Sequence, residues 1–258
     1  MIINVLPPSQ SILVIYYKEA LFIMKDRDLL LIIGGILLVY YLLGRRQLRA
    51  YAANSTGNKV SPRGATHVLK NPKVKLIFWG NWANAKPSIA EIDQLMKLLI
   101  ASNYFDAAAQ YGAGKPVYTG YTTNTNIPPP NFSDKELVKC VNEVFAQGKA
   151  PFDPEMIYYV IPQKGRKSWY HFGTVTAWHA QLTHITVAVY YGNYTQQDIM
   201  EAFAEEIVES IADPWRTPTG SRGFQIGDLC DYDPHKFTIN GLRIKGYWSN
   251  KDNKCANG

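Results

Sequence analysis

The chain has 258 residues, of which 13% are aromatic, and its Lys and Arg outnumber Asp and Glu by six. This length supports one sizeable core, and a membrane segment near the start favours one main domain over two. Residues 1–65 hold eight Lys and Arg against three acids, whereas residues 66–258 hold nineteen against eighteen. The near-neutral main domain gives no argument for nucleic-acid binding, and the basic start suits anionic lipid headgroups.

Residues 29–44 are predicted to form a single transmembrane helix. The run LLLIIGGILLVYYLLG has sixteen residues without a charge, and three arginines follow it closely. As a helix it spans roughly 24 Å, and flanking basic side chains extend it toward the roughly 30 Å of a hydrocarbon core. A buried globular helix is the alternative. Residues 1–28 form an N-terminal segment, unless synthesis starts at Met24, and residues 45–66 form a basic juxtamembrane linker.

Strand and helix patterns alternate after the linker. Val74–Gly80 (VKLIFWG) is typical of a buried strand, and apolar residues at helical spacing follow it. Ser88 and Glu91 form a capping-box pattern at the start of this first helix. The same S-x-x-E pattern, beginning at Ser133, precedes a second helix that Gly148 is placed to end.

The second half of the domain continues this alternation. The runs MIYYVIP and HITVAVYYG predict two more buried strands, and Thr195 is placed to cap a third helix. The segment KFTINGLRIKGYWS predicts a hairpin around Asn240 and Gly241. The order of these elements predicts one α/β or α+β domain over residues 67–258, with a mixed sheet flanked by helices.

The third helix contains the acidic stretch AFAEEIVESIADP. At 100° per residue, Glu201, Glu205 and Glu209 stack opposite the apolar face, and Glu206 lies at the edge, best placed to face a cleft. Like charges at this spacing cost only about 0.2 to 0.5 kcal/mol per pair, so a solvated acidic face is one interpretation. In the other, Glu205 and Glu209 bind a cation with help from Asp213, and oxygen ligands favour calcium over zinc.

Seven segments occur in the order VKLIFWGNW, QYGAGKPV, IYYVIP, GTVTAWHA, EEIVESIADP, IGDLCDY and GYWSNKDNKC. This series resembles the Exordium-like, phosphate-induced family of secreted proteins, chiefly its bacterial members, from about Val74 to Cys255. The family's helix typically reads H-E-L-x-E-A-x-T-D-P. Glu205 therefore stands at the histidine position, while Glu206 and Glu209 keep the two glutamates and the D-P ending is also kept.

The resemblance implies a secreted or surface-facing domain with a metallopeptidase-like helix. A zinc peptidase needs imidazole or carboxylate ligands, an open position and a glutamate that activates the bound water. Glu206 matches that base, and His179 matches the family's histidine after an aromatic residue. The candidate ligands for zinc or calcium are thus Glu205, Glu209, His179 and Asp213. Because Glu205 replaces a nitrogen ligand and adds negative charge, we predict an altered site that is inactive.

The resemblance also implies a disulfide between Cys230, in the G-D-x-C motif, and Cys255. A metal site at these cysteines is the alternative, but neither further cysteines nor histidines are spaced for it. The pair favours an extracytoplasmic or particle-surface location, although the arginines after the membrane span predict the cytoplasmic side. Cys140, in the second predicted helix, is expected to be a buried thiol. Three N-x-S/T acceptor sites also favour the outer location, at Asn54, Asn131 and Asn193.

Two functions follow from these patterns. We prefer a single-pass, membrane-anchored interaction or structural domain on a virion or cell surface, with a degenerate site, no catalysis and an unspecified protein partner. Tryptophans suit binding faces as well as cores, and the domain contains Trp79, Trp82, Trp169 and Trp178 among others. The alternative is a membrane-tethered metal-dependent peptidase or hydrolase, with Glu206 as general base and Glu209 and His179 as ligands.

Overall fold

The computed structural model describes residues 68–256, with the exception of 170–176, 183, 214–224 and 231–236. The predicted N-terminal segment (1–28), membrane span (29–44) and juxtamembrane linker (45–66) all lie outside the described residues. Within the described part of the chain, no helix has both the length and the apolar character required to cross a bilayer.

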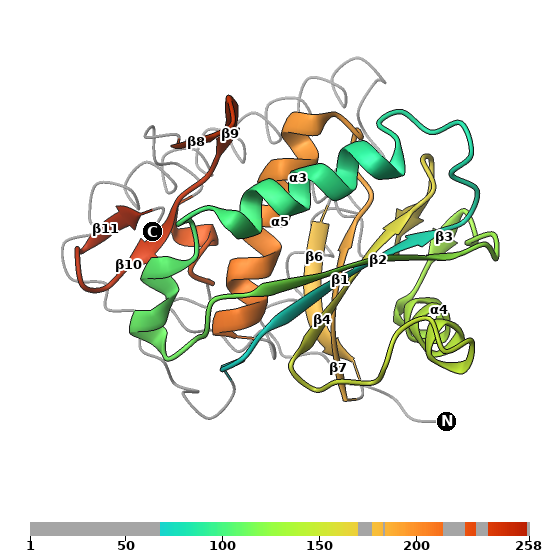
Figure 1. The fold of residues 1–258 in the computed structure, drawn as a ribbon, viewed down its shortest axis with the longest axis horizontal. Helices are drawn as coiled ribbons and strands as arrows, with labels where there is room; N and C mark the ends of the chain where they lie inside the picture. The colour runs from blue at the N-terminus through green and yellow to red at the C-terminus, as the bar shows by residue number, and fades with distance from the viewer. Residues whose placement is uncertain (1–67, 170–176, 183, 214–224, 231–236, 257–258) are drawn as a thin grey trace, which may run out of the picture. The chain divides into compact units, whose positions relative to one another are not determined.

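A five-stranded mixed sheet forms the centre of the described domain (Figure 1). In spatial order its strands are β2 (Val117–Asn124), β1 (Lys73–Trp79), β4 (Met156–Pro162), β7 (Ile185–Tyr190) and β6 (Ala177–Leu182). The first four strands are parallel to one another, whereas β6 runs antiparallel to β7. The predicted mixed sheet is therefore confirmed.

Both faces of this sheet are covered, and for that reason its central strands consist of continuous apolar runs. All residues of β4 are buried, and they alternate between two core clusters on opposite faces. The cluster on one face includes Ile157, Tyr159 and Ile161, and the cluster on the other includes Met156, Tyr158 and Val160. The predicted buried strands correspond to β1, β4 and β7 and are confirmed.

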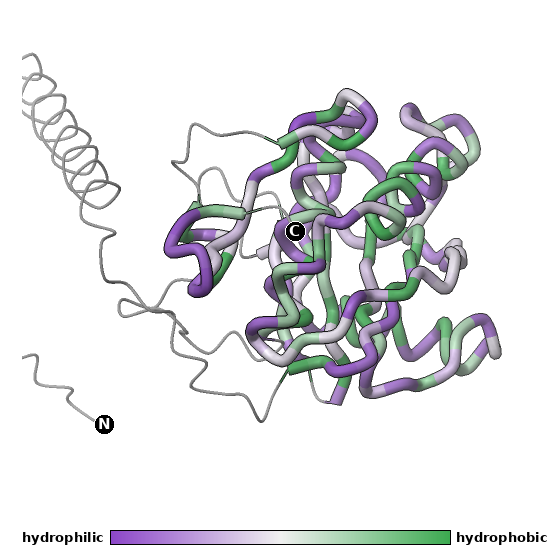
Figure 2. The backbone as a smooth tube through the Cα atoms, turned by 60° about the vertical axis from the view of Figure 1, so that its left-hand side comes forward, coloured by the Kyte–Doolittle hydropathy of each residue, from purple (hydrophilic) through white to green (hydrophobic). Residues whose placement is uncertain are grey.

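Helices α3 (Ile89–Ala101) and α5 (Gln196–Ala212) pack on one face of the sheet, and α4 (Asp134–Ala146) packs on the other (Figure 1). Both predicted capping boxes are formed, at the starts of α3 and α4. At the start of α5, the Thr195 hydroxyl accepts a hydrogen bond from the backbone N–H of Asp198 at 3.1 Å. Figure 2 shows hydrophobic and hydrophilic residues alternating along the helices, as expected for elements with one face in the core.

Short elements complete the fold around the sheet. Two 3₁₀ turns, η1 (Asp106–Tyr111) and η2 (Asp228–Cys230), lie on the α5 side. The remaining strands pair as β3 (Asn131–Phe132) with β5 (Lys167–Ser168), β8 (Phe237–Ile239) with β9 (Leu242–Ile244), and β10 (Tyr247–Ser249) with β11 (Lys254–Ala256).

The C-terminal segment agrees with the sequence predictions in two respects. Asn240 and Gly241 both have positive φ angles, of 51° and 79°, and they join β8 to β9 in the predicted hairpin. Cys230 and Cys255 form a disulfide with Cα atoms 5.9 Å apart, which ties η2 to β11. Cys140 is a buried free thiol in α4, also as predicted.

Candidate functional site

The site is centred on α5, which is buried on more sides than its sequence pattern predicts. Eleven of its residues are buried, among them Glu206 and Glu209, with 6% and 3% of their surface exposed. The interpretation of Glu209 as part of a solvated face is therefore wrong. The segment before η2 packs against this side of the helix. Gly227 lies so close to it that an added Cβ would stand 2.5 Å from Oε1 of Glu209.

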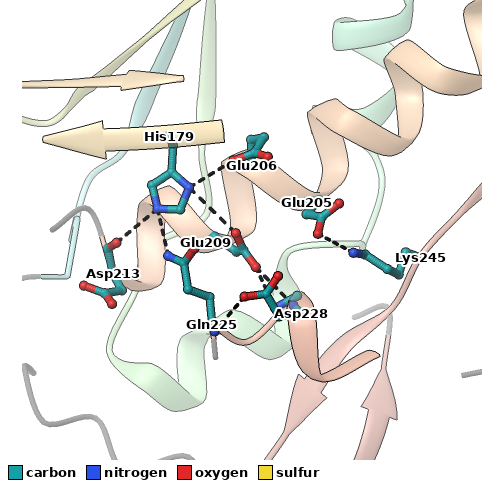
Figure 3. Close-up of polar contacts among 9 residues, drawn as sticks. His179, Glu205, Glu206, Glu209, Asp213, Gln225, Asp228 and Lys245 are labelled. Atoms are coloured by element: carbon teal, nitrogen blue, oxygen red, sulfur yellow. Dashed lines mark hydrogen bonds and ion pairs between the residues drawn. The ribbon is translucent and has the colours of Figure 1, made fainter. Parts of the chain in front are cut away.

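His179 joins this helix from the neighbouring strand β6. It pairs with Ala188 of β7, whose side chain belongs to the core on the α5 side, so the imidazole faces α5. Its Nδ1 atom lies 3.0 Å from Oε2 of Glu206 and 3.7 Å from Oε2 of Glu209 (Figure 3). Both near neighbours of Nδ1 are carboxyl oxygens, so the tautomer with hydrogen on Nδ1 donates a hydrogen bond to Glu206.

The other side of the imidazole contacts the residues that flank the end of α5. Its Nε2 atom lies 3.0 Å from the amide nitrogen of Gln225 and 3.3 Å from the backbone carbonyl oxygen of Asp213. The Gln225 amide donates to Nε2 when the ring is neutral, and the Asp213 carbonyl accepts from Nε2 when the ring is protonated. Both charge states of His179 therefore have hydrogen-bond partners, and the ring is fixed between β6 and α5.

Glu209 connects α5 to the G-D-x-C segment. Its Oε1 atom accepts hydrogen bonds from the backbone N–H groups of Gly227 and Asp228, at 3.1 and 3.2 Å. Burial raises the pKa of the Glu209 carboxyl well above the usual value of 4.5, and the nearby carboxylates of Glu205, Glu206 and Asp228 raise it further. The Lys245 ammonium group acts in the opposite direction. Glu209 thus lies where several negative charges meet in a poorly solvated environment.

Glu205 has a cationic partner that the sequence did not indicate. Lys245, in the connection between β9 and β10, donates a short hydrogen bond from Nζ to Oε1 of Glu205 (Figure 3). The two side chains are largely buried, with 12% and 25% of their surfaces exposed. A primary ammonium group therefore lies beside the position that the metallopeptidase pattern gives to a metal ligand.

Two sets of side chains in the described residues offer ligand atoms that all lie within 4.8 Å of one another. The first consists of His179, Glu206 and Glu209, and the second of Glu205, Glu209 and Asp228. The first mixes nitrogen and oxygen donors, as zinc accepts, whereas the second contains only oxygen, which suits calcium or magnesium. Glu209 belongs to both sets, so its two oxygens link them.

The candidate residues chosen from sequence are mostly brought together. His179, Glu205, Glu206 and Glu209 lie in one cluster, but Asp213 approaches His179 through its backbone carbonyl, and its side chain is in neither set found among the described residues. Sequence reasoning missed three members of the cluster. Asp228 had a signal, because it belongs to the G-D-x-C motif, whereas Gln225 and Lys245 lie in segments without any pattern.

The four tryptophans named from the sequence divide between the core and the surface. Trp79, Trp82 and Trp178 are core residues with at most 8% of their surface exposed, because both sheet faces and the adjoining loops bury their rings. Trp169 is 70% exposed. Of these four side chains, it is the one with a largely exposed aromatic surface.

Comparisons with known proteins give no match to a family model, to a curated protein or to a solved structure.

Proposed function

We propose that residues 67–258 form a non-catalytic, surface-facing binding or structural domain of Exordium-like type. Its peptidase-like helix has a structural role rather than a catalytic one. The motif series from Val74 to Cys255 supports this assignment. The disulfide between Cys230 and Cys255 supports a location outside the cytoplasm, since such bonds persist in oxidising compartments. We further propose that residues 29–44 anchor the domain in a lipid bilayer, on a cell or particle surface.

The ion pair between Lys245 and Glu205 carries the proposal for an inactive site. A metal bound by the second set would use Glu205, Glu209 and Asp228 and would leave Glu206 as the base. The Lys245 ammonium group already donates to Glu205 and lowers the pKa of Glu209. A divalent cation at this position would face a fixed positive charge, which opposes metal binding. The lysine thus supplies part of the positive charge that the metal would otherwise provide.

The hydrogen bond between His179 and Glu206 supports the same conclusion. A general base must reach the proton that it abstracts, and its pKa must suit proton transfer near neutral pH. The carboxylate of Glu206 instead accepts a hydrogen bond from His179 at 3.0 Å, and 6% of the residue's surface is exposed. These contacts suit a buried polar pair that holds β6 against α5.

A metal-dependent hydrolase is the second candidate, favoured by the first ligand set. His179, Glu206 and Glu209 would hold the ion, and the contact between Nε2 of His179 and the Asp213 carbonyl would orient the imidazole. A bound ion of this kind lowers the pKa of a coordinated water. However, this set uses Glu206 as a ligand, so the predicted base is no longer available. The geometry therefore favours the non-catalytic domain.

The two candidates are separated by a hydrolysis assay on purified full-length protein. An unstructured, fluorescently labelled protein is incubated with wild type and with Glu206→Gln, each in the presence of zinc, of calcium or of a chelator. We expect identical background cleavage in every sample. Metal-dependent cleavage that disappears in Glu206→Gln would establish the hydrolase. Glu143→Gln is the matched control, because it makes the same chemical change outside the cluster.

A further inference from the structure

A second site lies at the opposite end of α5, where three parallel strands end. β1 leads through α3 to β2 on one side, whereas β4 leads to β7 on the other, so the winding of the sheet reverses between β1 and β4 (Figure 1). Ligands of open α/β sheets bind outside the carboxyl ends of the strands at such a reversal. From Thr195 to Glu206 the helix rises roughly 16 Å, so this end is remote from the acidic cluster.

A cavity of about 480 Å³ occupies this position. Asn81 and Lys86 line it from the connection after β1, Gln163 and Lys164 from the residues after β4, and Tyr194 from those after β7. Cavities that hold small molecules have volumes of roughly 300 to 1,000 Å³. The cavity is therefore large enough for a ligand of the size of a monosaccharide.

Two of the three amide side chains that line this cavity, Asn81 and Gln163, have their oxygen atoms already engaged. Oε1 of Gln163 accepts a hydrogen bond from the backbone N–H of Asn81 at 2.8 Å, and Oδ1 of Asn81 accepts one from the N–H of Ala83 at 3.1 Å. Because a backbone N–H requires an acceptor, these contacts fix the orientation of both amides. Neither amide nitrogen donates to any residue that the structure describes. Both NH₂ groups are available to a ligand.

The surrounding backbone keeps Gln163 in this position. Gly80 has a φ angle of 105°, and an added Cβ would stand 2.5 Å from Oε1 of Gln163. Glycine therefore permits both the unusual backbone conformation and the close approach of the amide. Tyr194 also has a positive φ angle, of 55°, and its hydroxyl donates a short hydrogen bond to the carbonyl of Pro162. A strained residue held in this way is typical of a functional site.

The cavity is lined by positively charged groups as well as by hydrogen-bond donors. Lys86 and Lys164 are both exposed, and none of the described residues that line the cavity is acidic. Ammonium groups and amide NH₂ groups complement a ligand that accepts hydrogen bonds and carries negative charge.

We propose that this cavity binds a small organic anion of monosaccharide size, with a phosphate or carboxylate group between Lys86 and Lys164 and with acceptor oxygens toward the amides of Asn81 and Gln163. This site is independent of the proposed function of the acidic cluster.

The proposal is tested by calorimetric titration of the full-length protein with glucose 6-phosphate, gluconate and glucose. We expect both anions to bind more tightly than glucose, and affinity to fall as salt is added. The tighter of the two anions identifies the preferred acidic group. In amide NMR spectra, the side-chain NH₂ signals of Asn81 and Gln163 should shift on binding.

Two variants test the named contacts. Gln163→Glu keeps the oxygen that accepts from Asn81 but replaces the donor by a negative charge, so binding of glucose 6-phosphate should be lost. Lys164→Gln should weaken binding about fivefold, as expected for loss of one charge-assisted contact. The matched controls, Gln147→Glu and Lys251→Gln, change exposed residues outside the cavity and should bind like wild type.

Three results would overturn the proposal. The first is that neither anion binds at about 10 mM, a concentration at which even weak complexes form. The second is that glucose binds as tightly as the anions. The third is that Lys164→Gln binds glucose 6-phosphate as tightly as the wild type does.

Discussion

Replacing Lys245 by methionine removes the ammonium group that donates to Glu205 while keeping most of the side-chain volume. The carboxylate of Glu205 is then left near Glu209 and Asp228 without this charge. Exposed ion pairs contribute about 0 to 1 kcal/mol, whereas loss of one partner from a fully buried pair costs about 3 to 5 kcal/mol. With 12% and 25% of the two side chains exposed, we expect Lys245→Met to reduce the free energy of unfolding by roughly 2 to 4 kcal/mol.

Urea unfolding of the full-length protein at neutral pH, followed by tryptophan fluorescence, measures this loss. The double variant Glu205→Gln/Lys245→Met should recover a large part of it, because the uncompensated charge is also removed. Lys115 and Asp106 provide a matched control, since this pair lies at 2.9 Å but its side chains are 49% and 52% exposed. Lys115→Met should cost less than about 1 kcal/mol.

If Lys245→Met lowers the free energy of unfolding no more than Lys115→Met does, the buried ion pair is not stabilising. If the double variant is as unstable as Lys245→Met alone, the loss comes from packing rather than charge.

Three further predictions concern pH, thiol reactivity and the disulfide. Because burial raises the folded-state pKa of Glu209 above the unfolded value near 4.5, the contribution of this group to stability is fully present below that value and is lost as pH rises through the folded pKa. Glu209→Gln should therefore flatten the decline in unfolding free energy measured above pH 4.5. Burial also raises the pKa of the Cys140 thiol, so this cysteine should react with a thiol reagent only in denaturant, and a reaction in the native protein would contradict its burial. Breaking the link between Cys230 and Cys255, which are 25 residues apart, should lower the urea midpoint and cost roughly 3 kcal/mol; an unchanged midpoint in Cys255→Ala would refute this.

The parts of the fold that could be predicted are those where burial or capping leaves a local pattern. β1, β4 and β7 are buried on both faces, so each is an apolar run, and the caps of α3 and α4 appear as S-x-x-E. β2 was missed because it is an edge strand with several exposed residues and Gly120 in its middle. β6 was missed because its sequence, AWHAQL, is neither a continuous apolar run nor a strict alternation.

Only those members of the acidic cluster that lie on one helix could be predicted from the sequence. The spacing of Glu205, Glu206 and Glu209 places them on one helix, but the degree to which each is buried depends on segments that return from elsewhere in the chain. The helix pattern left a solvated face and a cation ligand both open for Glu209, because it cannot show that Gly227 packs against this side chain. Lys245 lies 40 positions from Glu205, so their pairing depends on tertiary structure alone.

The metal content of the purified protein after dialysis tests the central claim most directly. We predict far less than one zinc or calcium ion per chain in the wild type, because Lys245 occupies the cationic position at Glu205. The double variant Glu205→His/Lys245→Met restores a nitrogen ligand and removes the ammonium group, so it should gain zinc. One tightly held metal ion per wild-type chain would contradict the account and identify the acidic cluster as a metal centre.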